Sequence, residues 1–263
     1  MSNETPMILM DIETLAELVE PDRRHVWLVA APKTGSTWLN AILTSTLGWP
    51  TNALAIGGDR REQEIEICTM LPFLAGNLFS QHQHCRFSSV TADFINKFNV
   101  KVVLHGRNLF DSLVSFRDYT AEGFVEIPMA YIDEDFATLA PEQQLDFVID
   151  LVTPWYLNFY GSWFMSKQRG EVDYVWSPYE SLLEDTPKAT QNVLMGVGEV
   201  RSAEQILASM ELVSTMPTRL NVGRIGRGDK ILTAEQKERV YRLMDYYPKI
   251  DFSSVLHKPE ITA

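Results

Sequence analysis

Three short apolar runs, each followed by a turn and a helical pattern, define the predicted sequence of strands and helices along this chain. The first run, residues 26–31, is apolar and partly β-branched, which is typical of a buried parallel strand. A turn at residues 32–35 follows it. Beyond the turn, apolar positions recur at helical spacing from Trp38 to Leu47, and Gly48 ends the pattern. This stretch predicts a strand, a tight turn and a helix.

The same order returns twice along the chain. Residues 101–105 predict a second buried strand, and residues 109–119 predict the helix that follows it. Residues 171–177 predict a further strand with a turn and a short helix behind it, and residues 77–87 predict a strand with a weaker pattern. Strands that alternate with helices predict an α/β fold, a three-layer sandwich in which helices flank a central, mostly parallel sheet. Ligands of such folds bind at the carboxyl ends of the strands.

The rest of the pattern is mainly helical. Its largest predicted element is one long amphipathic helix over residues 142–167, whose aromatic side chains are assigned mostly to the core. Shorter helices are expected over residues 14–19, 62–74, 91–98, 187–195 and 202–210, and a last helix starts at Thr233. Residues 51–61 are polar and rich in glycine, and predict a surface loop.

Length and composition favour one large domain. The chain has 263 residues, of which 45% are hydrophobic, enough to bury a sizeable core. We expect a single domain over residues 1–263, with a lead-in over 1–24, a core over 25–245 and a C-terminal tail over 246–263. The two cysteines, Cys68 and Cys85, lack the spacing of a metal site. The N-terminus lacks a signal-peptide layout, and the longest uncharged stretch is too short for a membrane span, so we expect a cytoplasmic protein.

The net charge of −12 narrows the choice of partners. Nucleic acids and anionic membranes attract basic surfaces, so the acidic balance argues against both. A small molecule is the partner that the composition favours, and a homodimer stays open.

The turn after the first strand carries the first chemical signal. Backbone N–H groups and the positive end of a helix converge at such a turn, and together they bind phosphate or sulfate. In a Walker A loop the lysine follows the last glycine, whereas here Lys33 precedes Gly35. The loop therefore should grip the 5′ group of a nucleotide without being an ordinary ATP site. The alternative is a plain turn that ends in a helix N-cap at Ser36 or Thr37.

Two further basic elements lie later in the chain. Arg107 directly follows the second strand, and Ser115 lies two helical turns after it. Residues 218–230 contain three glycines and four cations without any apolar period, so they can wrap backbone N–H groups and guanidinium groups around a phosphate.

Taken together, these elements resemble the signature of the sulfotransferases that use 3′-phosphoadenosine 5′-phosphosulfate (PAPS), of the cytosolic, small-molecule type. Residues 32–39 are similar to the family's 5′-phosphosulfate loop, and residues 107–115 match its 3′-phosphate motif. Residues 179–183 resemble its tyrosine–glutamate segment, and residues 223–230 its C-terminal glycine–basic loop. The resemblance covers residues 25–245 and implies a P-loop-NTPase-like sandwich.

The resemblance also implies roles for individual residues. Lys33 would contact the bridging region of the phosphosulfate, Trp38 would stack on the adenine, and Tyr179 would lie near it. The 5′ cradle and the site of the 3′-phosphate would complete the binding of PAPS and of its product PAP. The full set implied for the cofactor is Lys33, Thr34, Gly35, Ser36, Thr37, Trp38, Arg107, Ser115, Tyr179, Arg224, Gly226 and Arg227. No metal is required.

The general base implied by the family is a histidine on the strand that precedes the one ending before Arg107, here the strand expected over residues 77–87. His84 has the expected spacing before Arg107, and His82 is its rival. The surrounding residues depart from the family pattern, because the usual lysine and proline near the histidine are missing. The glycine–basic loop departs as well, since it is shorter and lacks a tryptophan after its Gly-Asp pair.

We therefore expect an enzyme that moves a sulfuryl group from PAPS to a hydroxyl or amine of a small molecule. Residues 118–166 contain nine acids and interleaved aromatics but no Lys, Arg or His, which favours a cationic acceptor. The alternatives are a P-loop kinase or NTPase with Thr37 on Mg²⁺, and a non-catalytic protein that binds PAP or another nucleotide.

Overall fold

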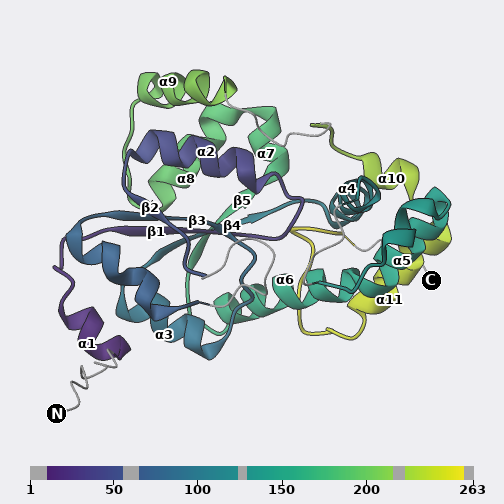
Figure 1. Cartoon of the computed structure of the whole chain (residues 1–263), viewed down its shortest axis with the longest axis horizontal. Coiled ribbons are helices and arrows are strands. Elements are labelled where there is room, and N and C mark those ends of the chain that lie inside the picture. Colours follow the sequence, from purple (N-terminus) through teal and green to yellow (C-terminus); the bar gives the residue numbers. More distant parts are fainter. Residues whose placement is uncertain (1–10, 56–64, 124–128, 216–222, 258–263) are drawn as a thin grey trace, which may run out of the picture.

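Five parallel strands form the centre of the molecule (Figure 1). A computed structural model describes residues 11–55, 65–123, 129–215 and 223–257. The strands are β1 (His25–Ala30), β2 (Thr51–Asn52), β3 (Leu78–Gln83), β4 (Lys101–Gly106) and β5 (Tyr174–Pro178). Their order is β2-β3-β1-β4-β5, and every pairing between neighbours is parallel. The predicted α/β class is therefore confirmed.

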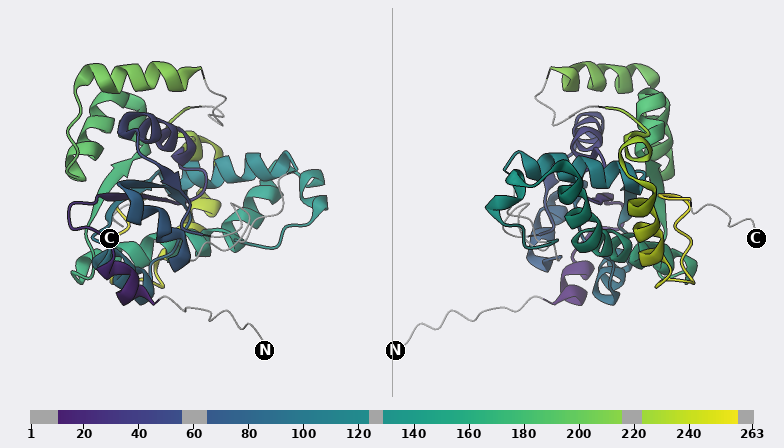
Figure 2. Two further views of the ribbon diagram at one scale, coloured as in Figure 1. Left: turned by 60° about the vertical axis from the view of Figure 1, so that its left-hand side comes forward. Right: turned by 90° about the vertical axis from the view of Figure 1, so that its right-hand side faces the viewer.

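Helices cover both faces of this sheet (Figures 1 and 2). One layer holds α2 (Ser36–Leu47), α7 (Tyr179–Glu184), α8 (Thr186–Gly196) and α9 (Ala203–Ser214), and the other holds α1 (Ile12–Glu17), α3 (Ser89–Lys97), the 3₁₀ helix η1 (Ile67–Ala75) and α6 (Thr153–Gln168). A group beyond the carboxyl ends of the strands comprises α4 (Leu109–Ala121), the 3₁₀ helix η2 (Glu134–Thr138), α5 (Pro141–Leu151), α10 (Arg227–Ile231) and α11 (Ala234–Met244).

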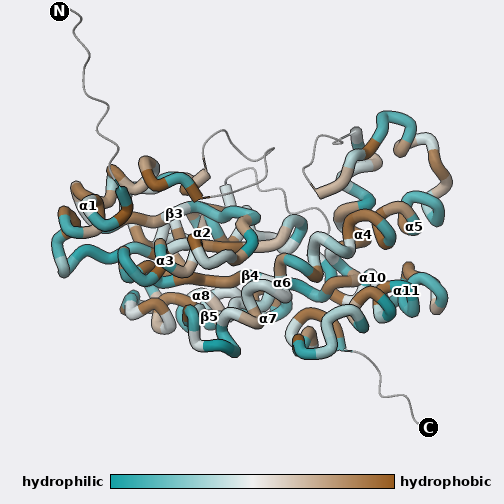
Figure 3. The backbone as a smooth tube through the Cα atoms, turned by 90° about the horizontal axis from the view of Figure 1, so that it is seen from below, coloured by the Kyte–Doolittle hydropathy of each residue, from teal (hydrophilic) through white to brown (hydrophobic). Residues whose placement is uncertain are grey.

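Alternation along β1 explains the two layers. Val26 and Leu28 belong to the apolar cluster under α2 and α8, whereas Trp27 and Val29 belong to the larger cluster with α3, α4 and α6. Successive side chains of a strand point to opposite faces, so a strand buried on both faces must be apolar throughout. In Figure 3 the tube beside the label β4 is coloured hydrophobic, as this requirement leads us to expect for a central strand.

Several predicted elements need correction. The long helix expected over residues 142–167 is two helices, α5 and α6, which meet at Val152. Pro154 at the start of α6 cannot donate the backbone hydrogen bond that a continuous helix would need. Part of the glycine–basic loop is also helical, as α10, and residues 51–52 of the predicted surface loop pair with β3.

Other predictions fall partly outside the described residues. These are residues 218–222 of the glycine–basic loop, 56–61 of the surface loop and 62–64 of the helix expected over 62–74, the described remainder of which forms η1. Within the described ranges, no helix has the length and apolar character needed to cross a membrane.

Candidate active site

The turn between β1 and α2 has the geometry of an anion site. Lys33 and Gly35 both adopt left-handed backbone conformations, with φ of 62° and 83°. Gly35 occupies the N-cap position of α2 and makes no side-chain cap, so the positive end of the helix faces the turn. The alternative of an N-cap at Ser36 or Thr37 is wrong, because both residues lie inside the first turn of the helix.

The predicted cradle residues differ in what they can offer. The Thr34 side chain is fully buried, and its hydroxyl donates to the Ala31 carbonyl at 2.7 Å. It therefore shapes the turn from inside. Ser36 is buried at the start of the helix and Thr37 is exposed. Trp38 is half-buried against the apolar cluster beneath α2.

Tyr179 packs directly on the turn. A Cβ atom at Gly35 would lie 2.5 Å from the Tyr179 ring, so only glycine fits there. The Arg107 guanidinium lies over the same ring, 4.5 Å from its centroid. Burial raises the pKa of the Tyr179 hydroxyl. The next residue, Glu180, accepts the backbone N–H of Asn108 at 2.9 Å and so ties α7 to the start of α4.

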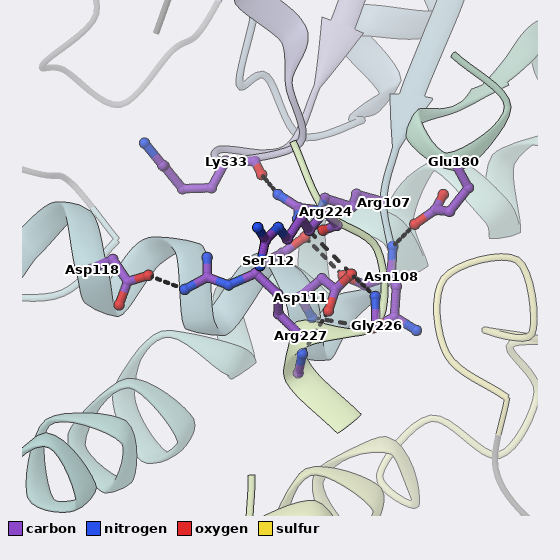
Figure 4. A network of polar contacts seen from close by, with 11 residues as sticks. Lys33, Arg107, Asn108, Asp111, Ser112, Asp118, Glu180, Arg224, Gly226 and Arg227 are labelled. Atoms are coloured by element: carbon purple, nitrogen blue, oxygen red, sulfur yellow. Dashed lines mark hydrogen bonds and ion pairs between the residues drawn. The ribbon is translucent and has the colours of Figure 1, made fainter. Parts of the chain in front are cut away.

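Arg107 joins the turn to the glycine–basic loop (Figure 4). Its Nη1 donates to the Lys33 carbonyl at 3.2 Å, and its Nη2 donates to the Arg224 carbonyl at 3.1 Å. The side chain is buried and lies 3.9 Å from the Asp111 carboxylate. The structure thus brings Lys33 and Arg107, which are far apart in the sequence, to one place.

Asp111 is an important residue that the sequence reasoning missed. Its buried carboxylate accepts the backbone N–H groups of Gly226 and Gly228, at 2.8 and 2.6 Å. A Cβ at Gly228 would lie 2.4 Å from the backbone of Phe110, so α10 rests directly on α4. The backbone N–H of Gly226, a predicted ligand residue, is therefore already bound to Asp111. The signal was an acid four residues after Arg107 on a predicted helix.

The other predicted cations lie beside α4. Arg227 donates to Asp118 at 2.7 Å, and Arg224 is exposed. The ammonium of Lys33 lies 3.9 Å from the centroid of the Tyr119 ring, on the side of the site where Figure 4 shows Asp118. Ser115 is buried on the same helix.

The two candidate histidines lie next to the turn. His84 follows the last residue of β3, and its Nδ1 donates to the carbonyl of Ala30 at 2.8 Å. Because a carbonyl only accepts, this bond assigns the proton to Nδ1 and leaves the lone pair of the neutral ring on Nε2. The His82 ring lies 6.0 Å from the His84 ring, and the backbone N–H of His82 donates to Asn40.

A third histidine, His105, was not predicted to take part. It is fully buried at the end of β4, where Nε2 donates to the Thr34 carbonyl at 2.9 Å and Nδ1 accepts from the Ser177 hydroxyl at 3.1 Å. Burial lowers the pKa of His105 to about 4, and the charge of Arg107 acts in the same direction. His105 is therefore neutral near pH 7. Its position in an apolar strand gave no local signal that its side chain binds the Thr34 carbonyl.

Fold and site together define a P-loop-like α/β protein with a second, arginine-bearing element against the turn between β1 and α2. The chain belongs to the sulfotransferase family, because the family model described as Sulfotransferase domain matches residues 23–221. The predicted family is thereby confirmed. No curated relative matches the chain in sequence.

Solved structures show the same fold. Mouse sulfotransferase SULT7A1 complexed with PAP is 13% identical, with a TM-score of 0.65 over 94% of this chain and 92% of that one. Retinol dehydratase in complex with androsterone and the inactive cofactor PAP is 11% identical, with a TM-score of 0.55 over 89% and 82% of the two chains. Its complex with retinol and PAP is also 11% identical, with a TM-score of 0.52 over 91% and 84%.

The two buried histidines predict how stability depends on pH. Burial lowers the pKa of His25 to about 3 and that of His105 to about 4, from an ordinary value of 6.5. Below pH 6.5 these two histidines bind protons in the unfolded chain but not in the folded chain. The free energy of unfolding therefore decreases as the pH is lowered. Each histidine should contribute about 1.4 kcal/mol per pH unit between about pH 6 and pH 5.

Urea unfolding of the wild type and of His105→Gln at pH 7, 6 and 5 measures this effect. The variant should lose about half of the histidine contribution to the slope, because only His25 remains. Identical slopes for the two proteins would contradict the prediction.

Proposed function

We propose that this protein transfers a sulfuryl group from PAPS to a hydroxyl or amine of a small-molecule acceptor. The observation that carries the proposal is the direct contact between Arg107 and the Lys33 carbonyl, at 3.2 Å. PAPS differs from ATP by a phosphate on the 3′ position, and a donor with phosphate at both ends of its ribose needs two cationic elements within one adenosine of each other. The turn and the arginine-bearing elements meet this requirement.

The residues present fit such a donor. The start of α2 and the N–H groups of the turn would hold the 5′ group, while Arg107, Ser115, Arg224 and Arg227 would hold the 3′-phosphate. Arg107 Nε is buried without a hydrogen-bond partner among the described residues, although both of its Nη atoms are bound to carbonyls. A phosphate oxygen would satisfy this donor. Trp38 and Tyr179 would lie near the adenine.

We expect the chain's own groups to support an in-line displacement. PAPS supplies the sulfuryl group and leaves as PAP, with the bond from sulfur to the leaving oxygen breaking as the bond to the acceptor forms. Lys33 and the positive end of α2 would stabilise the negative charge that develops on the leaving phosphate. The Nε2 atom of His84 would take the proton of the acceptor's hydroxyl or amine.

Replacement of Lys33 tests the role of the turn. Lys33→Ala should lower kcat by about 10²–10³-fold, because a charge aimed at the leaving group is lost, and should leave the fold intact. The measurement is transfer of labelled sulfate from PAPS, with circular dichroism as the check on folding. Lys167→Ala, on an exposed lysine near the far end of α6, is the matched control. A wild-type rate in Lys33→Ala would reject the proposed role.

Calorimetry on the same preparations separates the alternatives. Binding of PAP without binding of Mg-ATP supports the proposal, whereas the reverse would identify a kinase or NTPase. Tight PAP binding with no transfer to any acceptor would identify a non-catalytic nucleotide-binding protein.

The choice of base gives a second test. His84→Ala should lower kcat by about 10²–10⁴-fold with little effect on the affinity for PAP, since general-base catalysis acts on the acceptor's proton. His82→Ala should change kcat by only a few fold. The reverse result would assign the base to His82, and wild-type rates in both variants would exclude a histidine base.

The chemistry of the acceptor gives a third test. Asp118 forms ion pairs with Arg117 and Arg227. Asp146 and Asp150 both form ion pairs with Arg239. The other acids of residues 118–166 that the structure describes are exposed. Glu126 lies outside the described residues. We therefore expect the summed negative charge of these acids, and not a contact with one particular carboxylate, to attract a cationic acceptor.

Matched amine, neutral and carboxylate acceptors should show decreasing kcat/KM in that order. The differences should shrink as salt is added, because salt screens exposed charges. A preference for anionic acceptors would overturn this part of the proposal.

A further inference from the structure

Each of the five carbonyls from Ala30 to Thr34 accepts a hydrogen bond from a side chain. The donors come from five positions: Ala30 accepts from His84 Nδ1 at 2.8 Å, Ala31 from Thr34 Oγ1 at 2.7 Å, Pro32 from the Tyr156 hydroxyl at 2.7 Å, Lys33 from Arg107 Nη1 at 3.2 Å, and Thr34 from His105 Nε2 at 2.9 Å. We name this set the carbonyl clamp.

The carbonyl clamp determines where the N–H groups of the turn point. In a trans peptide the carbonyl of one residue and the N–H of the next point in opposite directions. Fixing the carbonyls of Pro32, Lys33 and Thr34 toward their donors therefore points the N–H group of each following residue away from that donor. Successive N–H groups on one side of a turn form the concave site that binds anions.

The clamp also offsets backbone strain. Lys33 is not a glycine, yet its φ is 62°, a conformation that costs an ordinary residue about 1–2 kcal/mol. The peptide planes on both sides of Lys33 are held, one through the bond from Tyr156 to Pro32 and the other through the bond from Arg107 to Lys33. The strained conformation can thus persist before any anion binds.

Two members of the clamp, Tyr156 and His105, are not among the residues expected to contact the donor. Both side chains are fully buried. Tyr156 comes from α6, where its ring packs against Tyr160 and Trp155, and its hydroxyl crosses to a residue 124 positions away. A buried hydroxyl that lost its partner would be costly, so the bond to Pro32 is favoured over alternatives.

We propose that Tyr156 and His105 are positioning residues that hold the turn in its anion-binding conformation. They act on the 5′ end of the donor and not on the 3′-phosphate, because the hydrogen bonds that they donate end on the carbonyls of Pro32 and Thr34. The inference rests on the proposed function for the identity of the ligand.

Three nucleotides with different phosphates test the inference: 5′-AMP, 3′-AMP and PAP. In calorimetry, Tyr156→Phe should weaken 5′-AMP and PAP by about tenfold, the effect of one lost hydrogen bond, and should leave 3′-AMP unchanged. Tyr174→Phe is the matched control, because it removes a hydroxyl from β5 that makes no bond to the turn, and it should change none of the three affinities.

His105 provides an independent pair of variants. Glutamine can donate to the Thr34 carbonyl and accept from Ser177, whereas leucine can do neither. His105→Gln should therefore retain most of the affinity for 5′-AMP, and His105→Leu should lose about tenfold. If His105→Leu does not fold, the affinities of Tyr156→Phe and His105→Gln still test the inference.

The possible outcomes are distinct. Selective loss of 5′-AMP affinity supports the inference. Unchanged affinities in Tyr156→Phe and His105→Leu, or equal losses on 5′-AMP and 3′-AMP, would overturn it while leaving the proposed function in place. A wild type that binds neither PAP nor 5′-AMP would reject the proposed function and the inference together.

Discussion

The guanidinium of Arg107 is the group on which the arrangement of this site depends. It binds the carbonyls of Lys33 and Arg224, which lie 74 and 117 positions away in the chain. A cation with so little exposure is costly to desolvate unless polar groups surround it. The two carbonyls, the Asp111 carboxylate and the face of the Tyr179 ring supply those groups. The charge that would meet a phosphate therefore also holds the walls of its site together.

The parts of the fold with a local signal were predictable. The strand, turn and helix from β1 to α2 follow from apolar spacing and from the glycines at either end of the helix. The break between α5 and α6 was missed because the apolar pattern continues across Val152, and only Pro154 marks it. The short helix α10 was missed for a different reason. It is stabilised by its contact with α4 and by Asp111, neither of which its own residues reveal.

The residues of the site likewise include some that were predictable from the sequence and others that were not. The meeting of Lys33 with Arg107 was predictable, since the carboxyl ends of neighbouring parallel strands lie at one edge of a sheet. The partners of Asp111, His105 and Tyr156 were not, because each acts through a backbone group that is distant in the sequence, although the spacing of Asp111 from Arg107 was a local signal. From the sequence, His105 belongs to an apolar strand and Tyr156 to a row of core aromatics. Nothing in their own segments shows which carbonyl or N–H group they meet.

The assembly of the site from distant segments has a consequence for the folding and the stability of the protein. The walls of the site come from β1, β4, α6, α7 and the residues before α10, so segments far apart in the chain each contribute one piece. Pairings between distant segments form slowly, since long loops must close before the contacts reward them. The site is thus complete only after α10 and the residues before it have docked on α4. A nucleotide that bound the folded site and not the unfolded chain would stabilise the folded protein. The supply of nucleotide would then influence how long each copy of the protein survives, apart from how fast it works.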